Sequence, residues 1–488
     1  MTGTATLPGF APEALTDLLR VAAAPDFDRW RDQIRRTGGC ANPIHLTGWT
    51  TTQDKTTGRL LHHTTSDDQP GGRLRVACGN RRASRCAPCS YLYAGDAYRL
   101  IRAGLCGDDV MRIPAAVRER PRVFLTLTAP SFGPVHNQPD TGRCRCGVRH
   151  RDDDPALGTA LNPSAYDYAG TVLFNNHAGD LWHRFVNRLR REIALRAGLT
   201  QREFADVARL SYGKVAEFQN RGVIHFHAVI RLDGPEGSAS QPPAWATLDL
   251  LTDAIAAAHR HPYTRVTVPA VADQPARDLT WGARFDVRPI TAFATDDINE
   301  GKVAAYVAKY ATKAAESTGA TDRAVYCGTC RGSGGFPTIQ HADGTPVYCR
   351  TCEGSGMGQD PATLPVPDHI RRLMLACADL QRLYPKRMLA RWAHMLGFRG
   401  HFLTKSRAYS STFTERRQVR ADYRADQQRQ ALGLPDPDTT LVLAHWRYAG
   451  HGHTPGESWI AAGIAEDIRT NRETAREARA DLVTPGEW

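Results

Sequence analysis

The sequence lacks the apolar stretches that mark exported or membrane proteins. Its N-terminus has no basic segment followed by an apolar one, and no run of about eighteen apolar residues occurs in the chain. We therefore expect a soluble, cytoplasmic protein with no membrane partner. The sequence also lacks the Gly-x-x-x-x-Gly-Lys-Ser/Thr loop that cradles nucleotide phosphates, which excludes a P-loop NTPase.

Acidic residues are outnumbered by basic ones. The 488 residues include 62 Lys and Arg against 51 Asp and Glu, which gives a formal net charge of +11. An excess of positive charge favours a polyanionic partner such as DNA. The length is enough for about two to four domains, each with its own core.

Strand and helix patterns alternate along the middle of the chain. Residues 122–128 alternate as a strand does, 211–232 read as a hairpin, and 180–199 and 300–316 have helical periodicity. The sequence therefore predicts an α+β fold whose central antiparallel sheet is flanked by helices. We expect the following segments: an N-terminal helical segment 1–38, a cysteine-rich zinc-binding region 39–110, a core 118–316 with a Cys/His-rich loop 131–163, a zinc ribbon 319–360, and a helical, basic C-terminal region 365–488.

The stretch EFQNRGVIHFHAVI places one carboxylate and two imidazoles close together. If residues 220–222 form a three-residue turn with Gly222 in the left-handed conformation, Glu217 pairs with His225. Alternation along the strand puts His227 on the same face, so the three side chains converge. This set suits Mg²⁺, Mn²⁺ or zinc, although buried, hydrogen-bonded histidines would give the same pattern. Gln219 shares the face and is an alternative to Glu217 as third ligand.

Two tyrosines share one face of the helix predicted at 300–316. A helical step of about 100° per residue gathers Lys302, Tyr306, Lys309, Tyr310 and Lys313 on one arc. The opposite side is small and apolar. A surface helix with ordinary lysines would look the same. Beside a metal-binding hairpin, a phenol surrounded by ammonium groups can also attack phosphorus and form a phosphotyrosine.

Ten of the twelve cysteines lie in close pairs or near histidines, which in a reducing compartment indicates metal rather than disulfides. Two Cys-x-x-Cys pairs separated by eighteen residues predict a structural zinc site. Three groups of ligands follow from the spacing: Cys327, Cys330, Cys349 and Cys352; Cys40, Cys78, Cys86 and Cys89, with His45 as a substitute; and a possible third site of His136, Cys144, Cys146 and His150.

Three stretches in order, RVFLTLTAPSFG, EFQNRGVIHFH and AAYVAKYATK, resemble the motifs of HUH endonucleases. The closest resemblance within that superfamily is to the two-tyrosine rolling-circle replication initiators of actinobacterial, Streptomyces-type plasmids and integrative elements. It covers about residues 40–410. The resemblance implies a five-stranded antiparallel sheet whose central strands carry His225 and His227 as metal ligands. It also implies that Tyr306 or Tyr310 nicks the double-strand origin, keeps the 5′ phosphate and leaves a 3′ hydroxyl primer.

The residues add expectations to this resemblance. The metal, Mn²⁺ or Mg²⁺, would polarise the phosphate, Lys309 and Lys313 would stabilise charge, and Thr126 and Thr128 would support the site from the first strand. Host helicase and DNA polymerase would be the partners, with the origin single-stranded at the nick.

DNA contacts outside the site would use the zinc modules and basic patches. One such patch comprises Arg416, Arg417 and Arg420, although a solvated helix face explains these arginines equally well. Two other readings stay open. A related HUH transposase or relaxase would share the motifs, and a non-catalytic zinc-containing DNA-binding regulator would share the charge and the cysteines.

Overall fold

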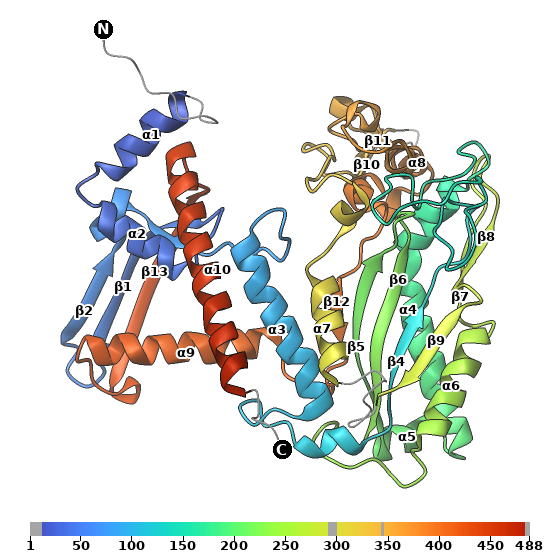
Figure 1. Ribbon diagram of the computed structural model, residues 1–488, viewed down its shortest axis with the longest axis horizontal. Coiled ribbons are helices and arrows are strands. Elements are labelled where there is room, and N and C mark those ends of the chain that lie inside the picture. Colours follow the sequence, from blue (N-terminus) through green and yellow to red (C-terminus); the bar gives the residue numbers. More distant parts are fainter. Residues whose placement is uncertain (1–11, 291–299, 343–345, 484–488) are drawn as a thin grey trace. The chain divides into compact units, whose positions relative to one another are not determined.

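The computed structural model describes residues 12–290, 300–342 and 346–483 (Figure 1). Four predicted segments therefore extend beyond the described residues: the N-terminal helical segment at 1–11, the core at 291–299, the zinc ribbon at 343–345 and the C-terminal region at 484–488. The chain forms two compact units. We call residues 1–96 with 413–488 the terminal unit and residues 97–412 the central unit.

The central unit is a mixed α+β structure around a five-stranded sheet with the strand order β12-β5-β6-β4-β9. All neighbouring strands in it run antiparallel, as expected. Its strands are β4 (Arg122–Leu127), β5 (Arg209–Phe218), β6 (Ile224–Asp233), β9 (Phe285–Pro289) and β12 (Leu403–Lys405). Two smaller hairpins are β7 (Arg265–Val268) with β8 (Arg277–Thr280), and β10 (Gly335–Gln340) with β11 (Pro346–Tyr348).

Helices cover both faces of this sheet (Figure 1). The helices of the central unit are α4 (Tyr168–Arg196), α5 (Gln201–Val207), α6 (Leu248–Arg260), α7 (Glu300–Ala311) and α8 (Asp368–Leu383). One face of β6 packs into the main core, where the ring of Phe226 lies 6.0 Å from that of Trp182 on α4. Helix α7 contacts β5, and its tyrosines lie against the opposite face of the sheet. That face carries the polar residues discussed below.

The terminal unit is built from both ends of the chain. Its helices are α1 (Pro12–Ala22), α2 (Phe27–Arg36), α9 (Phe413–Ala431) and α10 (Pro455–Val483), and its strands are β1 (Ile44–Asp54), β2 (Leu60–Thr65), β3 (Leu74–Val76) and β13 (Thr440–His451). Helix α3 (Ala87–Cys106) leads the chain from this unit into the central one. Strand β1 pairs antiparallel with β2, β3 and β13.

A buried carboxylate ties the terminal unit together. Glu457, near the start of α10, accepts hydrogen bonds from Trp30 Nε1 at 3.0 Å and Arg75 Nη2 at 3.1 Å through Oε1. Its Oε2 accepts one from the backbone N–H of Thr454 at 3.0 Å. Burial alone would raise the pKa of Glu457, but its contacts with His453, Thr454 and Arg75 outweigh that effect and lower it to about 2.

Two predictions of helix were wrong in part. The region 365–488 was expected to be helical, yet it contributes β12 and the twelve-residue β13 as well as α8, α9 and α10. Strand β13 exists because β1 supplies its hydrogen-bonding partner, a pairing that local sequence cannot reveal. The helix expected at 300–316 ends at Ala311, since Ala314 adopts an extended conformation with φ −147°.

Among the described residues, no helix is both long and apolar enough to cross a lipid bilayer.

Candidate active site

The hairpin of β5 and β6 has the register that the sequence predicted. Glu217 pairs with His225 and Phe218 with Ile224, and the Gln219 N–H donates to the Val223 carbonyl at 2.9 Å across the turn. Gly222 has a φ of +73°, the left-handed conformation that this turn requires. Because opposite residues share a face, the carboxylate and both imidazoles lie on the side of the sheet that faces α7.

Glu217, His225 and His227 form one cluster of ligand atoms. Glu217 Oε2 lies 2.9 Å from His225 Nε2 and 3.0 Å from His227 Nε2, and the two nitrogens are 3.2 Å apart. All three potential ligand atoms lie within 4.8 Å of one another. One oxygen and two nitrogens converging in this way are a donor set that fits a divalent cation.

The alternative ligand Gln219 is engaged elsewhere. Its Oε1 accepts hydrogen bonds from Arg221 Nε at 3.1 Å and Arg221 Nη2 at 2.9 Å. Arg221 also donates to the carbonyls of Ala129 and Pro130, which ties the turn to the end of β4. The geometry therefore favours Glu217 as the third ligand.

Glu217 and His227 have shifted pKa values, and each is in the protonation state that a metal ligand needs. Burial alone would raise the pKa of Glu217, but hydrogen bonds from His225 and His227 lower it to about 2, so the carboxylate is ionised at neutral pH. Burial lowers the pKa of His227, which keeps its imidazole neutral.

Strand β4 supports His227 from the side. Thr126 is the cross-strand partner of His227, and its Oγ1 lies 3.0 Å from His227 Nδ1. When Nδ1–H donates to that hydroxyl, the lone pair of Nε2 faces the cluster. Phe124 stacks on the His227 ring with centroids 5.6 Å apart and planes inclined by 6°. Thr126 was expected to support the site; the role of Phe124 was missed, because a phenylalanine in a strand signals only a core.

The two tyrosines of α7 lie over this cluster. Tyr306 Oη is 3.2 Å from Glu217 Oε2 and 3.0 Å from His227 Nε2. The ring of Tyr310 stands 4.6 Å from that of Tyr306 and 6.3 Å from that of His227. Burial, followed by the nearby Glu217 carboxylate, raises the pKa of both phenols. Tyr306 therefore contacts two of the three candidate ligands directly.

The lysines surround the second phenol. Lys309 Nζ and Lys313 Nζ lie 5.6 and 5.2 Å from the centre of the Tyr310 ring. Lys313 follows the end of α7 rather than lying on it, yet it still reaches that ring. Lys302 is exposed on the helix. Ammonium groups at these distances stabilise negative charge near a phenol.

A buried ion pair fixes the start of α7. Glu300 Oε1 accepts a hydrogen bond from Arg122 Nη2 at 2.5 Å, and Cys106 Sγ donates to Oε2 of the same carboxylate at 3.0 Å. Arg122 is the first residue of β4, so this pair ties the tyrosine helix to the strand that supports His227. Sequence reasoning missed it, because nothing in the local pattern joins residues so far apart in the chain.

A second missed residue holds the turn of the hairpin. The buried Asn175 on α4 accepts from the Ile224 N–H at 2.9 Å and donates to the Gly222 carbonyl at 2.8 Å. A polar side chain within an otherwise apolar helix face was the signal that could have identified it.

The three predicted cysteine groups are each assembled in the structure. In every group the four potential ligand atoms lie within 4.8 Å of one another, so each could hold zinc. The members are Cys40, Cys78, Cys86 and Cys89 in the terminal unit, and, in the central unit, Cys327, Cys330, Cys349 and Cys352 around the β10–β11 hairpin and His136, Cys144, Cys146 and His150 in the long loop. His45 is not part of the first group.

The group of two histidines and two cysteines in the long loop has an additional carboxylate next to it. His150 Nδ1 lies 2.6 Å from Asp154 Oδ2, and its Nε2 lies 3.3 Å from Cys146 Sγ. A carboxylate on the far nitrogen of an imidazole orients it as a metal ligand. Asp154 was not among the residues singled out from the sequence.

The arginines of α9 do not form a freely exposed patch. Arg420 makes a two-point contact with Asp96, whose second bond runs from Nη2 to Oδ2 at 2.8 Å. Arg416 is buried, and Arg417 lies over the Phe413 ring at 5.8 Å. Their contacts favour a structural role over the DNA-binding role we considered.

The site belongs to an α+β protein in which two tyrosines lie over a candidate metal centre. The chain also contains groups that could hold zinc. Residues 26–466 match the family described as RepSA, replication initiator protein, pSAM2, and the chain belongs to this family of replication initiator proteins. The chain is 62% identical over 475 residues to a replication initiator protein of Streptomyces ambofaciens, covering 97% of each chain. No solved structure matches it. As a replication initiator, the chain acts on DNA.

Proposed function

We propose that this replication initiator is an HUH endonuclease of the two-tyrosine type. It nicks the double-strand origin of a rolling-circle plasmid or integrative element by metal-dependent strand transfer, and it leaves a 3′ hydroxyl primer and a 5′ phosphotyrosine. The observation that carries the proposal is the contact of Tyr306 Oη with both Glu217 Oε2 and His227 Nε2.

The donor set supports a metal site beside the tyrosines. A divalent cation, Mn²⁺ or Mg²⁺, held by Glu217, His225 and His227 would act as a Lewis acid that polarises the scissile phosphate. Thr126 and Phe124 hold the His227 ring in position from β4. The Arg122–Glu300 pair fixes α7, so that the phenols are aligned before DNA binds.

The chemical step exchanges one ester bond for another. Tyr306 Oη attacks the phosphorus, an Oη–P bond forms, and the bond from phosphorus to the 3′ oxygen breaks. The phenol loses its proton to solvent, and the leaving 3′ oxygen takes a proton from solvent. The products are a phosphotyrosine and a free 3′ hydroxyl.

Tyr310 would carry out the terminating transfer. Its ring stands 4.6 Å from that of Tyr306, so a small shift of the DNA would exchange the two phenols. Lys309 and Lys313 adjoin Tyr310 and would stabilise its phenolate and the charge on the phosphate. Host helicase would unwind the duplex and host DNA polymerase would extend the primer.

A related transposase or relaxase would share this site, and a regulator would need none of it. The family match favours the initiator over the other HUH enzymes. The contact of a tyrosine with a carboxylate and an imidazole favours an enzyme over a regulator, because DNA binding alone does not require it.

The test is a covalent adduct. Purified full-length protein is incubated with Mn²⁺ and labelled single-stranded DNA from the origin of its own element, denatured, and analysed by mass spectrometry. We expect a phosphotyrosine on Tyr306 that disappears in Tyr306→Phe and in His225→Ala. Tyr348→Phe, an exposed tyrosine on β11, is the matched control and should form the adduct normally.

Two results would refute the proposal. Tight origin binding without an adduct across several metals and origin fragments would leave a non-catalytic regulator. An adduct that survives the double change of Tyr306 and Tyr310 to phenylalanine would place the nucleophile elsewhere.

A further inference from the structure

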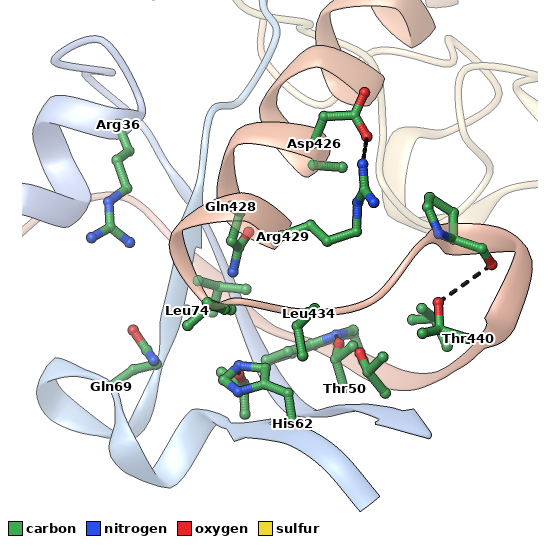
Figure 2. A pocket seen from close by; sticks show the side chains of 17 residues that line it. Arg36, Thr50, His62, Gln69, Leu74, Asp426, Gln428, Arg429, Leu434 and Thr440 are labelled. Carbon is green, nitrogen blue, oxygen red and sulfur yellow. Dashed lines mark hydrogen bonds and ion pairs between the residues drawn. The ribbon is translucent and has the colours of Figure 1, made fainter. Parts of the chain in front are cut away.

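The terminal unit contains a cavity that nicking does not use. It has a volume of about 520 Å³ and lies between one face of the β1–β2–β13 sheet and the end of α9 with the loop that follows (Figure 2). Pockets of this size accept small ligands. Every lining residue belongs to the terminal unit, so the cavity is a feature of that unit alone.

Apolar side chains line the cavity both from the sheet and from the segment after α9, and they include a fixed aromatic ring. Leu74, Leu432, Leu434 and Val442 line it together with Trp446. Trp446 Nε1 donates to Thr50 Oγ1 at 2.9 Å, which fixes the orientation of the indole. A flat, apolar ring would find both aliphatic contacts and a stacking partner there.

A buried polar atom in the cavity wall has no partner within the described chain. Arg429 Nε is buried and unpartnered there, although Nη2 of the same side chain bonds to Asp426 Oδ1 at 3.0 Å. Thr52 also lines the cavity, is only 8% exposed and brings a hydroxyl to the wall. Buried polar groups are nearly always hydrogen-bonded. Arg429 Nε therefore favours a polar ligand in the cavity, and the Thr52 hydroxyl can contribute a second hydrogen bond to it.

The charge of the lining favours an anion. Asp426, the one carboxylate in the wall, is paired with Arg429, as the dashed line in Figure 2 shows. Arg36, at the end of α2, is exposed and lies on the side of the cavity away from Thr440 (Figure 2). Its guanidinium makes no ion pair with the described residues. A ligand with a negative group for Arg36 and a flat ring for Trp446 would match this lining.

We propose that this cavity binds one nucleotide, with the base against Trp446 and the leucines and the phosphate at Arg36. Thr52 and Arg429 Nε would hydrogen-bond the base edge or sugar. The ligand could be an unpaired base of DNA or a free nucleotide, since both present the same chemistry. Only the assignment to origin DNA rests on the proposed function.

The first experiment is calorimetric titration of the full-length protein with each of the four deoxynucleoside 5′-monophosphates, without divalent metal. We expect saturable binding of at least one of them. Thr52→Val, which removes the hydroxyl at constant shape, and Arg36→Ala should each weaken it about tenfold or more. The matched controls are Thr47→Val on the opposite face of β1 and Arg35→Ala on the same helix, and both should bind like the natural protein.

The second experiment separates the two sources. Single-stranded origin DNA is compared with copies that carry one abasic site at successive positions. A single position whose abasic copy binds about tenfold more weakly, with that difference lost in Thr52→Val, assigns the ligand to DNA. Nucleotide binding without such a position assigns it to a free nucleotide. Equal binding by the natural protein, Thr52→Val and Arg36→Ala in both experiments would overturn the proposal.

These results do not depend on nicking. A monophosphate has no phosphodiester to cleave, and the titration contains no divalent metal. Failure of the adduct assay would leave the nucleotide pocket standing, and loss of the pocket would leave the tyrosine chemistry standing.

Discussion

The two units differ in how far the strands of their sheets are buried. In the central unit nine of the ten residues of β6 are buried, because helices cover both faces. In the terminal unit nine of the twelve residues of β13 are exposed. Thirteen of the twenty large, exposed hydrophobic side chains found among the described residues belong to the terminal unit, although it is roughly half as long.

The formal charge is divided just as unevenly. The central unit has 40 basic against 30 acidic residues, a net charge of +10, while the terminal unit has 22 against 21. Nearly all of the attraction for a polyanion therefore comes from the unit that holds the tyrosines. Under the two proposals made above, the central unit would hold and cut the strand, and the terminal unit would make contacts of shape and stacking.

The largest expected effect comes from removing one ligand of the cysteine group in the terminal unit. We expect Cys40→Ser to remove one zinc per chain and to unfold the terminal unit, because a structural zinc contributes on the order of 10 kcal/mol to folding. Metal analysis and limited proteolysis would show the loss and leave a resistant central fragment. A variant with full zinc content and a resistant terminal unit would contradict the expectation.

A smaller effect should come from the carboxylate that ties the terminal unit together. Glu457→Gln should destabilise that unit by about 3 kcal/mol, because Arg75 then keeps a buried charge without its partner. Thermal unfolding measures it. Glu466→Gln, an exposed carboxylate on the same helix, is the control and should change little.

The pKa of Glu457 gives that effect a pH dependence. Because folding lowers the pKa from 4.5 to about 2, the stabilisation is complete above about pH 4.5 and is lost as the pH falls toward 2. The difference between the natural protein and Glu457→Gln should therefore shrink over that range. A difference that stays constant on acidification would refute this assignment.

In the central unit, Thr126→Val should weaken metal binding about 10- to 100-fold, because His227 loses the hydroxyl at its Nδ1. The Mn²⁺ concentration needed for half-maximal adduct formation should rise, and excess Mn²⁺ should restore the yield. Thr128→Val, two residues along, tests whether the effect is specific to the residue opposite His227. A lower yield that Mn²⁺ cannot restore would argue against a role through the metal.

The smallest expected effect concerns the exposed lysines. Lys309→Ala should slow the transfer by Tyr310 about two- to fivefold, since an exposed cation over an aromatic ring contributes about 0.5 to 1 kcal/mol. Formation of a second adduct on Tyr310, by protein that already carries a preformed Tyr306 adduct, measures that step. Lys302→Ala on the same helix is the control, and equal slowing in both variants would indicate a general effect of charge.

The sequence predicted the parts of the site that short-range geometry determines. The β5–β6 register follows from one turn, and the cysteine groups follow from their spacing, so both could be inferred without a fold. Asn175, Phe124 and the Arg122–Glu300 pair could not, because each acts on a residue far away in the chain. The same reason hid β13, whose partner β1 lies nearly four hundred residues earlier.

That pairing also sets an order of events during synthesis. Strand β1 ends at Asp54 and β13 begins at Thr440, so the edge of β1 leaves the ribosome long before its partner exists. At roughly 5–20 residues per second, the interval between synthesis of β1 and synthesis of β13 is on the order of 20 to 80 s. The central unit, residues 97–412, is complete in the meantime and can fold first. Only a chain translated almost to its end can close the terminal unit, so a truncated product would keep the tyrosines and lack the pocket.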